Sequence, residues 1–109
     1  MIQISTNNQI DEIISTGEPV LIYFSGENCS VCKVLKPKID NEISNNFPEI
    51  KIYEVKADLY KEIASKFLVF SIPTILVFFD SKEFFRKGRN ISISSFINEL
   101  ERPYSLFTN

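Results

Sequence analysis

The feature that most limits what this chain can fold into is a pair of cysteines directly behind a short apolar run. Cys29 and Cys32 are the only cysteines among the 109 residues. They follow Val20–Phe24, whose short length and continuous apolar character predict a central strand buried on both faces. Beyond Cys32 the apolar residues recur at helical spacing. The pair is therefore expected at a strand-to-helix junction.

The rest of the chain alternates between predicted strands and predicted helices. Strands are expected near residues 2–4, 20–24, 50–55, 74–79 and 83–86, and helices near residues 10–14, 33–45, 59–66 and 92–102. The last two strands are separated by a tight turn and should form a hairpin. This order predicts a single α/β domain in which helices flank a central mixed sheet.

The C-terminal end of the chain contains a proline. Pro103 restricts the conformation of the residue before it, so the last helix is expected to end at Arg102. The core of the domain would then comprise residues 1–101, followed by a tail at 102–109. From Tyr104 onward this tail would either dock through Leu106 and Phe107 or fray.

The composition argues against several classes of partner. The formal net charge is -2 and 24% of the residues are charged, so the chain has no broad basic field for nucleic acid. No segment approaches the roughly 18 apolar residues of a membrane-spanning helix. The N-terminal residues lack the basic and apolar regions of a secretory signal. We therefore expect a cytoplasmic monomer that binds neither nucleic acid nor membrane.

The residues leave several uses open for the cysteine pair. A structural disulfide across so short a ring would contribute at most about 2 kcal/mol, and two buried thiols could also be simple core residues. A structural zinc ion needs four ligands, but the chain has two thiols and no histidine, so only a dimer could complete such a site. No flavin or nucleotide motif is present, and we expect neither a cofactor nor a metal. Redox chemistry is the use that the strand–helix setting favours most.

Over about residues 1–101 the chain resembles the thioredoxin family. The features that carry the resemblance are the strand leading into Cys29-Ser30-Val31-Cys32, Pro37 one turn further along the helix, and Ser71-Ile72-Pro73-Thr74 before the fourth strand. The resemblance implies the thioredoxin fold, with the element order βαβαβαββα. It also implies a thiol-disulfide oxidoreductase that reduces protein disulfides and takes electrons from a thioredoxin-reductase-type donor or from small thiols. The alternative is a binding or redox-sensing module with this fold.

In this reading the two cysteines have different roles. At the N-terminus of a helix, the sulfur of Cys29 meets unpaired backbone N–H groups and the positive end of the helix dipole, which both favour the thiolate. Cys29 is therefore the expected nucleophile, and Cys32 is expected to resolve the mixed disulfide.

Other residues are expected to line the substrate site. The resemblance implies that the Ile72–Pro73 bond is cis and that the backbone of Ile72 pairs with an extended substrate segment, whereas the plain alternative is a trans proline at the start of a strand. Ser30 and Val31 lie between the cysteines. Asn28, Ser71 and Gly88 occupy the positions that line the groove around the sulfur in the family.

The chain departs from the family pattern at two places. Typical thioredoxins carry Trp-Cys-Gly-Pro-Cys, and both residues between the cysteines differ here, which leaves the reduction potential open. In addition, Tyr23 replaces a buried aspartate. We hypothesise that Glu54, on the neighbouring strand, supplies the carboxylate and relays a proton near Cys32, with its pKa raised by burial and with Tyr23 hydrogen-bonded to it. The alternative is a half-exposed strand glutamate.

Overall fold

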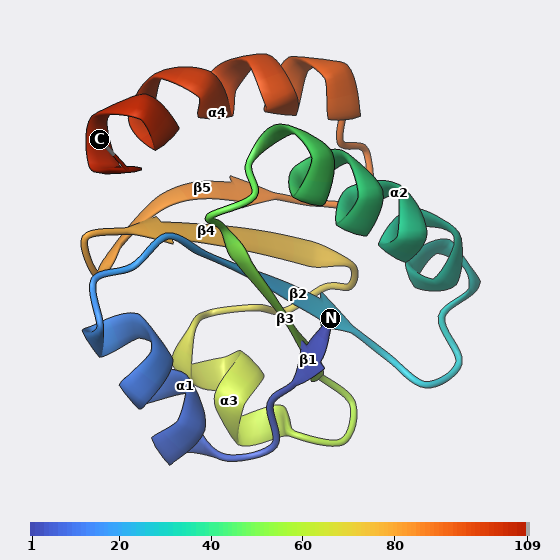
Figure 1. The fold of residues 1–109 in the computed structure, drawn as a ribbon. Helices are drawn as coiled ribbons and strands as arrows, with labels where there is room; N and C mark the ends of the chain where they lie inside the picture. The colour runs from blue at the N-terminus through green and yellow to red at the C-terminus, as the bar shows by residue number, and fades with distance from the viewer. Residues whose placement is uncertain (109) are drawn as a thin grey trace.

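The computed structural model describes residues 1–108 and contains strands and helices in the expected order (Figure 1). The elements are β1 (Ile2–Gln3), α1 (Asn7–Ser15), β2 (Val20–Ser25), α2 (Ser30–Asn46), β3 (Lys51–Lys56), α3 (Lys61–Lys66), β4 (Thr74–Phe79), β5 (Lys82–Lys87) and α4 (Ile93–Thr108). Helix α2 begins directly after Cys29, which confirms that the cysteine pair lies at a strand-to-helix junction.

The strands form one mixed sheet with the order β1-β3-β2-β4-β5. Strand β3 runs parallel to both β1 and β2, whereas β4 is antiparallel to β2 and forms the expected hairpin with β5. Strand β2 lies in the middle, and each of its residues is buried, as its continuous apolar sequence predicts. In the register between β2 and β3, Tyr23 is paired with Glu54.

The sheet separates two apolar cores, because successive residues of a strand point to opposite faces. Helices α2 and α4 cover one face of the sheet, and α1 and α3 cover the other (Figure 1). The strand residues of the α2 and α4 side include Leu21, Tyr23, Ile75, Val77 and Phe79. Those of the α1 and α3 side include Val20, Ile22, Phe24, Leu76 and Phe78. Tyr23 therefore faces the helix that begins at the cysteine pair.

Helix α4 differs from the expectation, because it does not end at Arg102. It continues through Pro103 to Thr108. The ring of Phe107 stacks on Phe79 with 5.6 Å between centroids and meets Phe84 edge-on at 5.3 Å. These aromatic contacts favour the extra helical turns over fraying, although the proline removes one backbone donor. Asn109 lies outside the described residues.

The last turns are attached to the rest of the fold at a second point. Tyr104 packs edge-on against Phe47, with ring centroids 4.9 Å apart, and its hydroxyl accepts a hydrogen bond from the N–H of Glu49 at 3.1 Å. Leu106, by contrast, is exposed. The segment therefore docks through Tyr104 and Phe107, and not through Leu106.

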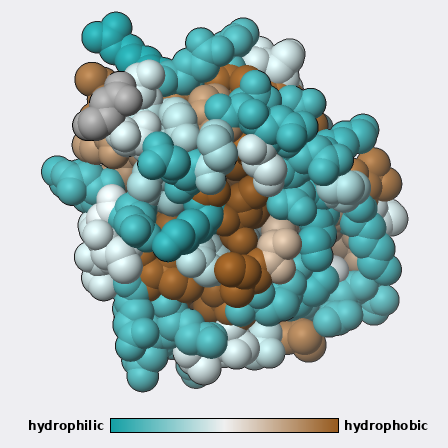
Figure 2. Space-filling view, in the orientation of Figure 1, coloured by the Kyte–Doolittle hydropathy of each residue, from teal (hydrophilic) through white to brown (hydrophobic). Residues whose placement is uncertain are grey.

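The surface in the same orientation is mostly hydrophilic (Figure 2). Hydrophobic surface appears in the middle of this view. Among the strand residues, Ile2 in the short edge strand β1 is exposed. Within residues 1–108, no helix has the length and apolar character needed to cross a membrane.

Candidate active site

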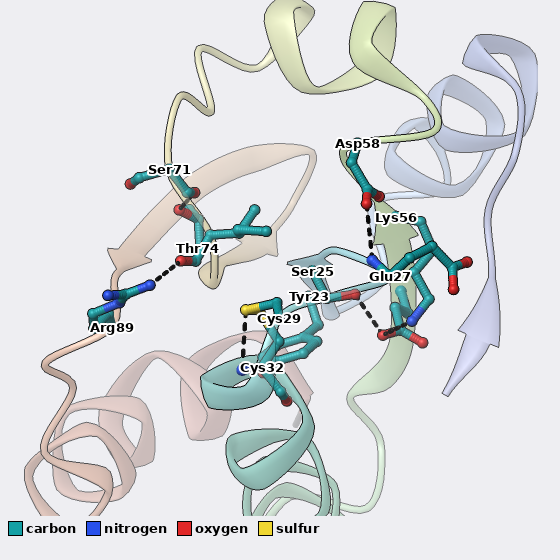
Figure 3. Close-up of a disulfide and its surroundings, with 12 residues drawn as sticks. Tyr23, Ser25, Glu27, Cys29, Cys32, Lys56, Asp58, Ser71, Thr74 and Arg89 are labelled. Carbon is teal, nitrogen blue, oxygen red and sulfur yellow. Dashed lines mark hydrogen bonds and ion pairs between the residues drawn. A yellow bond between two sulfur atoms is a disulfide. The ribbon is translucent and has the colours of Figure 1, made fainter.

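The two cysteines form a disulfide at the N-terminal end of α2, with their Cα atoms 5.2 Å apart (Figure 3). Cys29 is the N-cap residue of the helix and is partly exposed, whereas Cys32 lies in its first turn and is only 2% exposed. A substrate can therefore approach the sulfur of Cys29 more readily than that of Cys32.

The surroundings of the Cys29 sulfur favour negative charge. The sulfur accepts a hydrogen bond from the backbone N–H of Cys32 at 3.2 Å, as an N-cap side chain does. It also lies at the positive end of the dipole of α2, a helix of 17 residues. Both effects stabilise a thiolate at Cys29 once the disulfide is reduced.

The segment before β4 has the geometry that the resemblance implies. The Ile72–Pro73 peptide bond is cis, and Pro73 is buried. The hydroxyl of Thr74 donates to the carbonyl of Ser71 at 2.7 Å, which fixes the turn from within. From outside, Nη2 of Arg89 donates to the carbonyl of Ile72 at 3.3 Å. In Figure 3, Arg89 extends toward the segment that carries Ser71 and Thr74, on one side of the cysteine pair.

The remaining predicted site residues are distributed over separate hollows around the pair. Ser30 and Val31 line a groove along the start of α2. Ser71 and Gly88 line another hollow, of about 270 Å³, between the proline segment and the end of β5. Asn28 is exposed on the loop before Cys29. Each of these residues is thus at the surface near the ends of the elements that carry the cysteines and Pro73.

Glu54 is not a half-exposed strand residue, because its side chain is only 1% exposed. Its carboxylate accepts hydrogen bonds from Nζ of Lys36 at 2.7 Å, from the hydroxyl of Ser25 at 2.7 Å and from the side-chain amide of Gln3. Nζ of Lys56 lies 3.5 Å from the same carboxylate. The group is therefore an ionised carboxylate surrounded by donors.

The expected rise in the pKa of Glu54 is wrong. Burial by itself raises this pKa, but hydrogen bonds from Lys36, Ser25 and Gln3, together with the charge of Lys36, outweigh burial and lower it to about 2. A carboxylate with so low a pKa is a poor proton acceptor at neutral pH. The geometry therefore gives Glu54 the role of an acceptor that ties α2 to the sheet, and it does not support a proton relay.

The expected hydrogen bond between Tyr23 and Glu54 is also wrong. The Tyr23 hydroxyl instead donates to the backbone carbonyl of Cys32 at 2.7 Å. Burial, and secondly the negative charge of Glu54, raise the pKa of Tyr23 to about 12. At neutral pH the phenol is therefore a hydrogen-bond donor and not a base.

Sequence reasoning missed three residues that shape this region. A Cβ atom added to Gly26 would lie 2.6 Å from Cδ1 of Ile72, so the loop before the cysteines passes directly against the proline segment. The carboxylate of Asp58 accepts a hydrogen bond from the backbone N–H of Glu27 at 2.9 Å and also holds that loop. Arg89 is the third. Of these three residues, only Gly26, just after a predicted strand, could have been noticed in the sequence as a sign of close backbone approach.

Comparison with known proteins identifies the family. The thioredoxin family model matches residues 1–101. The chain belongs to the thioredoxin family. It is 33% identical to the thioredoxin-like protein YdfQ of Bacillus subtilis over 98 residues. This aligned stretch covers 90% of this chain and 87% of YdfQ. It is 30% identical over 81 residues to thioredoxin-1 of Saccharomyces cerevisiae, covering 74% of this chain and 78% of that thioredoxin.

Solved structures agree on the fold. The thioredoxin of Trypanosoma brucei brucei superposes with a TM-score of 0.81 at 24% identity, covering 93% of this chain and 88% of that one. Oxidised thioredoxin O2 of Arabidopsis thaliana superposes with a TM-score of 0.80 at 20% identity, and the superposition covers 94% of this chain and 93% of that one. The expected thioredoxin fold is confirmed.

The family and the cysteine pair together establish the class of activity. The protein is a thiol-disulfide oxidoreductase, and Cys29-Ser30-Val31-Cys32 carries its redox-active pair. Thioredoxins act on disulfide substrates and receive electrons from a reductase or a thiol donor. Within residues 1–108, no group of three or more metal-ligating side chains could hold an ion.

Proposed function

We propose that this protein reduces disulfides in protein substrates, with Cys29 as the nucleophile and Cys32 as the resolving thiol. The observation that carries the assignment is the hydrogen bond from the Cys32 N–H to the sulfur of Cys29 at the start of α2. Together with the exposure of Cys29 and the burial of Cys32, this bond gives the two cysteines different roles.

The reaction proceeds by two thiol-disulfide exchanges. The Cys29 thiolate attacks one sulfur of the substrate disulfide, so that a bond forms to Cys29 and the other substrate sulfur leaves as a thiolate, which takes up a proton. The Cys32 thiol then loses its proton and attacks the sulfur of Cys29, which releases the second substrate thiolate. The substrate gains two electrons and two protons, and the protein is left with the Cys29–Cys32 disulfide.

Substrate backbone would bind at the cis-proline segment. Ile72 is half-buried, packs against the core cluster that contains Cys32, and accepts a hydrogen bond from Arg89 at its carbonyl. An extended segment can pair with such a backbone in the manner of an added strand, which gives broad reach with little sequence preference. Asn28, Ser71 and Gly88 would border this segment.

Return of the disulfide to the dithiol requires an electron donor and a reducing compartment. We assign these to a thioredoxin-reductase-type enzyme or small thiols and to the cytoplasm, where the thiol pools keep cysteines reduced. Alkylation of thiols in intact cells, followed by mass analysis, measures how much of the cysteine pair is reduced in the cytoplasm.

The protein would act as a monomer, since one chain carries both thiols.

The test compares two single-cysteine variants on a protein disulfide substrate. The wild-type protein should reduce the substrate catalytically in the presence of a dithiol donor. Cys29→Ser should abolish this activity, whereas Cys32→Ser should accumulate a mixed disulfide through Cys29 that mass analysis detects. Retention of activity by Cys29→Ser, or trapping of the substrate on Cys32, would contradict the assignment.

A redox titration then decides the direction of electron flow. The protein is equilibrated in buffers of defined thiol-disulfide potential, and its free thiols are alkylated and counted by mass. A midpoint near about -270 mV marks a reductant, whereas a midpoint above about -200 mV marks an oxidant or isomerase. The second result would replace the proposed reductase with an oxidising role for the same pair.

A further inference from the structure

A groove runs along the start of α2, directly beside the reactive cysteine. It has a volume of about 300 Å³ and is lined by Ser30, Val31, Val34, Leu35, Lys38 and Arg89. Val34 is 61% exposed in it, and Val31 is also exposed. Because the groove begins with the residue after Cys29, a substrate segment bound to Cys29 through a mixed disulfide would lie next to this apolar surface.

The charges around the groove have a single sign. Its two ionisable lining residues are Lys38 and Arg89, and no acidic residue contributes to the lining. Neither cation takes part in an ion pair among residues 1–108, whereas the nearby Lys87 is paired with Glu99 at 2.7 Å. The whole chain carries a formal net charge of -2, so this positive region is local and not an effect of overall charge.

Arg89 connects the groove to the proline segment. One of its guanidinium nitrogens, Nη2, donates to the carbonyl of Ile72 at 3.3 Å. A guanidinium carries five N–H donors, so most of them are left for another acceptor. Figure 3 shows this side chain extending toward the segment before β4, across from the start of α2. A carboxylate in the groove would thus meet a donor that is already held in position.

We propose that this groove selects disulfide substrates in which an apolar residue and an acidic residue lie next to the reacting cysteine. This inference rests on the proposed reductase function. Val31 and Val34 contact the apolar side chain, while Lys38 and Arg89 bind the carboxylate. Arginine can bind a carboxylate through two parallel hydrogen bonds, and such charge-assisted bonds are stronger than neutral ones. Complementary charge also speeds the encounter of the two molecules.

The test uses two synthetic peptides, each with one internal disulfide. They are identical except that a valine beside one cysteine is followed by glutamate in the first peptide and by glutamine in the second. Fully reduced protein is mixed with each peptide, the reaction is quenched with acid, and the thiols are alkylated and counted by mass. The quantity compared is the ratio of the two second-order rate constants, so that a general change in reactivity cancels.

We expect the wild-type protein to reduce the glutamate peptide about 5-fold faster at low ionic strength, and this preference to shrink in high salt. Arg89→Gln and Lys38→Gln should each lower the ratio to about 2, and the double variant should bring it to about 1. Arg89→Lys retains the charge and should retain part of the preference. The control is Lys82→Gln, which removes an equal charge from an exposed lysine at the start of β5, beside the end of β4 that lies away from Pro73, and should leave the ratio unchanged.

The possible failures are distinguishable. Equal rates on both peptides in the wild type would overturn the groove assignment while leaving the reductase function intact. An equal fall of the ratio in Lys82→Gln would overturn it too, because the preference would then follow net charge. If neither peptide were reduced, the proposed function would fail, and this inference would fail with it.

Discussion

The hydroxyl of Tyr23, in the central strand β2, donates a 2.7 Å hydrogen bond to the backbone carbonyl of Cys32 in the first turn of α2. Typical members of the family have an aspartate at this strand position. Here the buried side chain holds the backbone of the resolving cysteine and does not act as an acid or a base, because its pKa is raised to about 12. The redox pair is thus fixed to the sheet by a neutral donor.

Tyr23→Phe removes that hydrogen bond while keeping the ring in the core. The free energy of unfolding should fall by about 1 kcal/mol, which urea denaturation measures. The pH dependence of resolution by Cys32 between about pH 6 and 9 should not change, since the phenol stays protonated throughout that range. A shift in this pH profile would show that the phenol takes part in proton transfer.

Glu54→Gln tests the low pKa of the buried carboxylate. Its pKa is lowered from 4.5 to about 2 in the folded protein. A lowered pKa means that the stabilisation is fully present above about pH 4.5 and is lost as the pH falls through about 2, and the shift corresponds to about 3 kcal/mol. We expect the variant to be less stable than the wild type by about 2 kcal/mol at neutral pH, since the glutamine still accepts hydrogen bonds.

The difference in free energy of unfolding between Glu54→Gln and the wild type should therefore approach zero near about pH 2. Urea denaturation of both proteins at a series of pH values measures this difference in the free energy of unfolding. Glu101→Gln removes an exposed charge from α4 and is the matched control, which should change stability by less than about 0.5 kcal/mol at any pH. A difference for Glu54→Gln that does not vary with pH would contradict the low pKa.

Phe107→Ala tests the docking of the last turns of α4. The ring stacks on Phe79 and packs edge-on against Phe84, and it is partly exposed. Its loss should lower the free energy of unfolding by about 1–2 kcal/mol. Disulfide reduction should be unaffected, because the end of α4 lies across the molecule from the start of α2 (Figure 1). An unchanged stability would show that the helix end does not dock in solution.

Local patterns were sufficient for much of the fold. The continuous apolar residues of β2, the helical spacing beyond Cys32 and the tight turn before β5 each depend on neighbours in the chain. Even the turn conformation is local, with positive φ angles of 53° at Asp80 and 63° at Ser81. The cis bond before Pro73 was expected only from the resemblance to the family.

The site shows what local patterns leave open. Tyr23 and Glu54 lie beside each other on neighbouring strands, as expected. The pKa of Glu54, however, depends on two opposing effects: burial raises it, and hydrogen-bond donors from β1, β2 and α2 lower it. Residues from these three elements are far apart in sequence, so neither the sign of the shift nor the partner of Tyr23 could be predicted from the chain.

The sequence by itself therefore determined the position of the redox pair, the order of the elements and the class of chemistry, because periodicity and the spacing of the cysteines are properties of neighbouring residues. Only the tertiary structure decided the protonation of Glu54, the hydrogen bond of Tyr23, the course of α4 through Pro103 and the place of Arg89 beside Ile72. Each of these depends on opposing interactions between distant segments, whose balance is set by their positions in space.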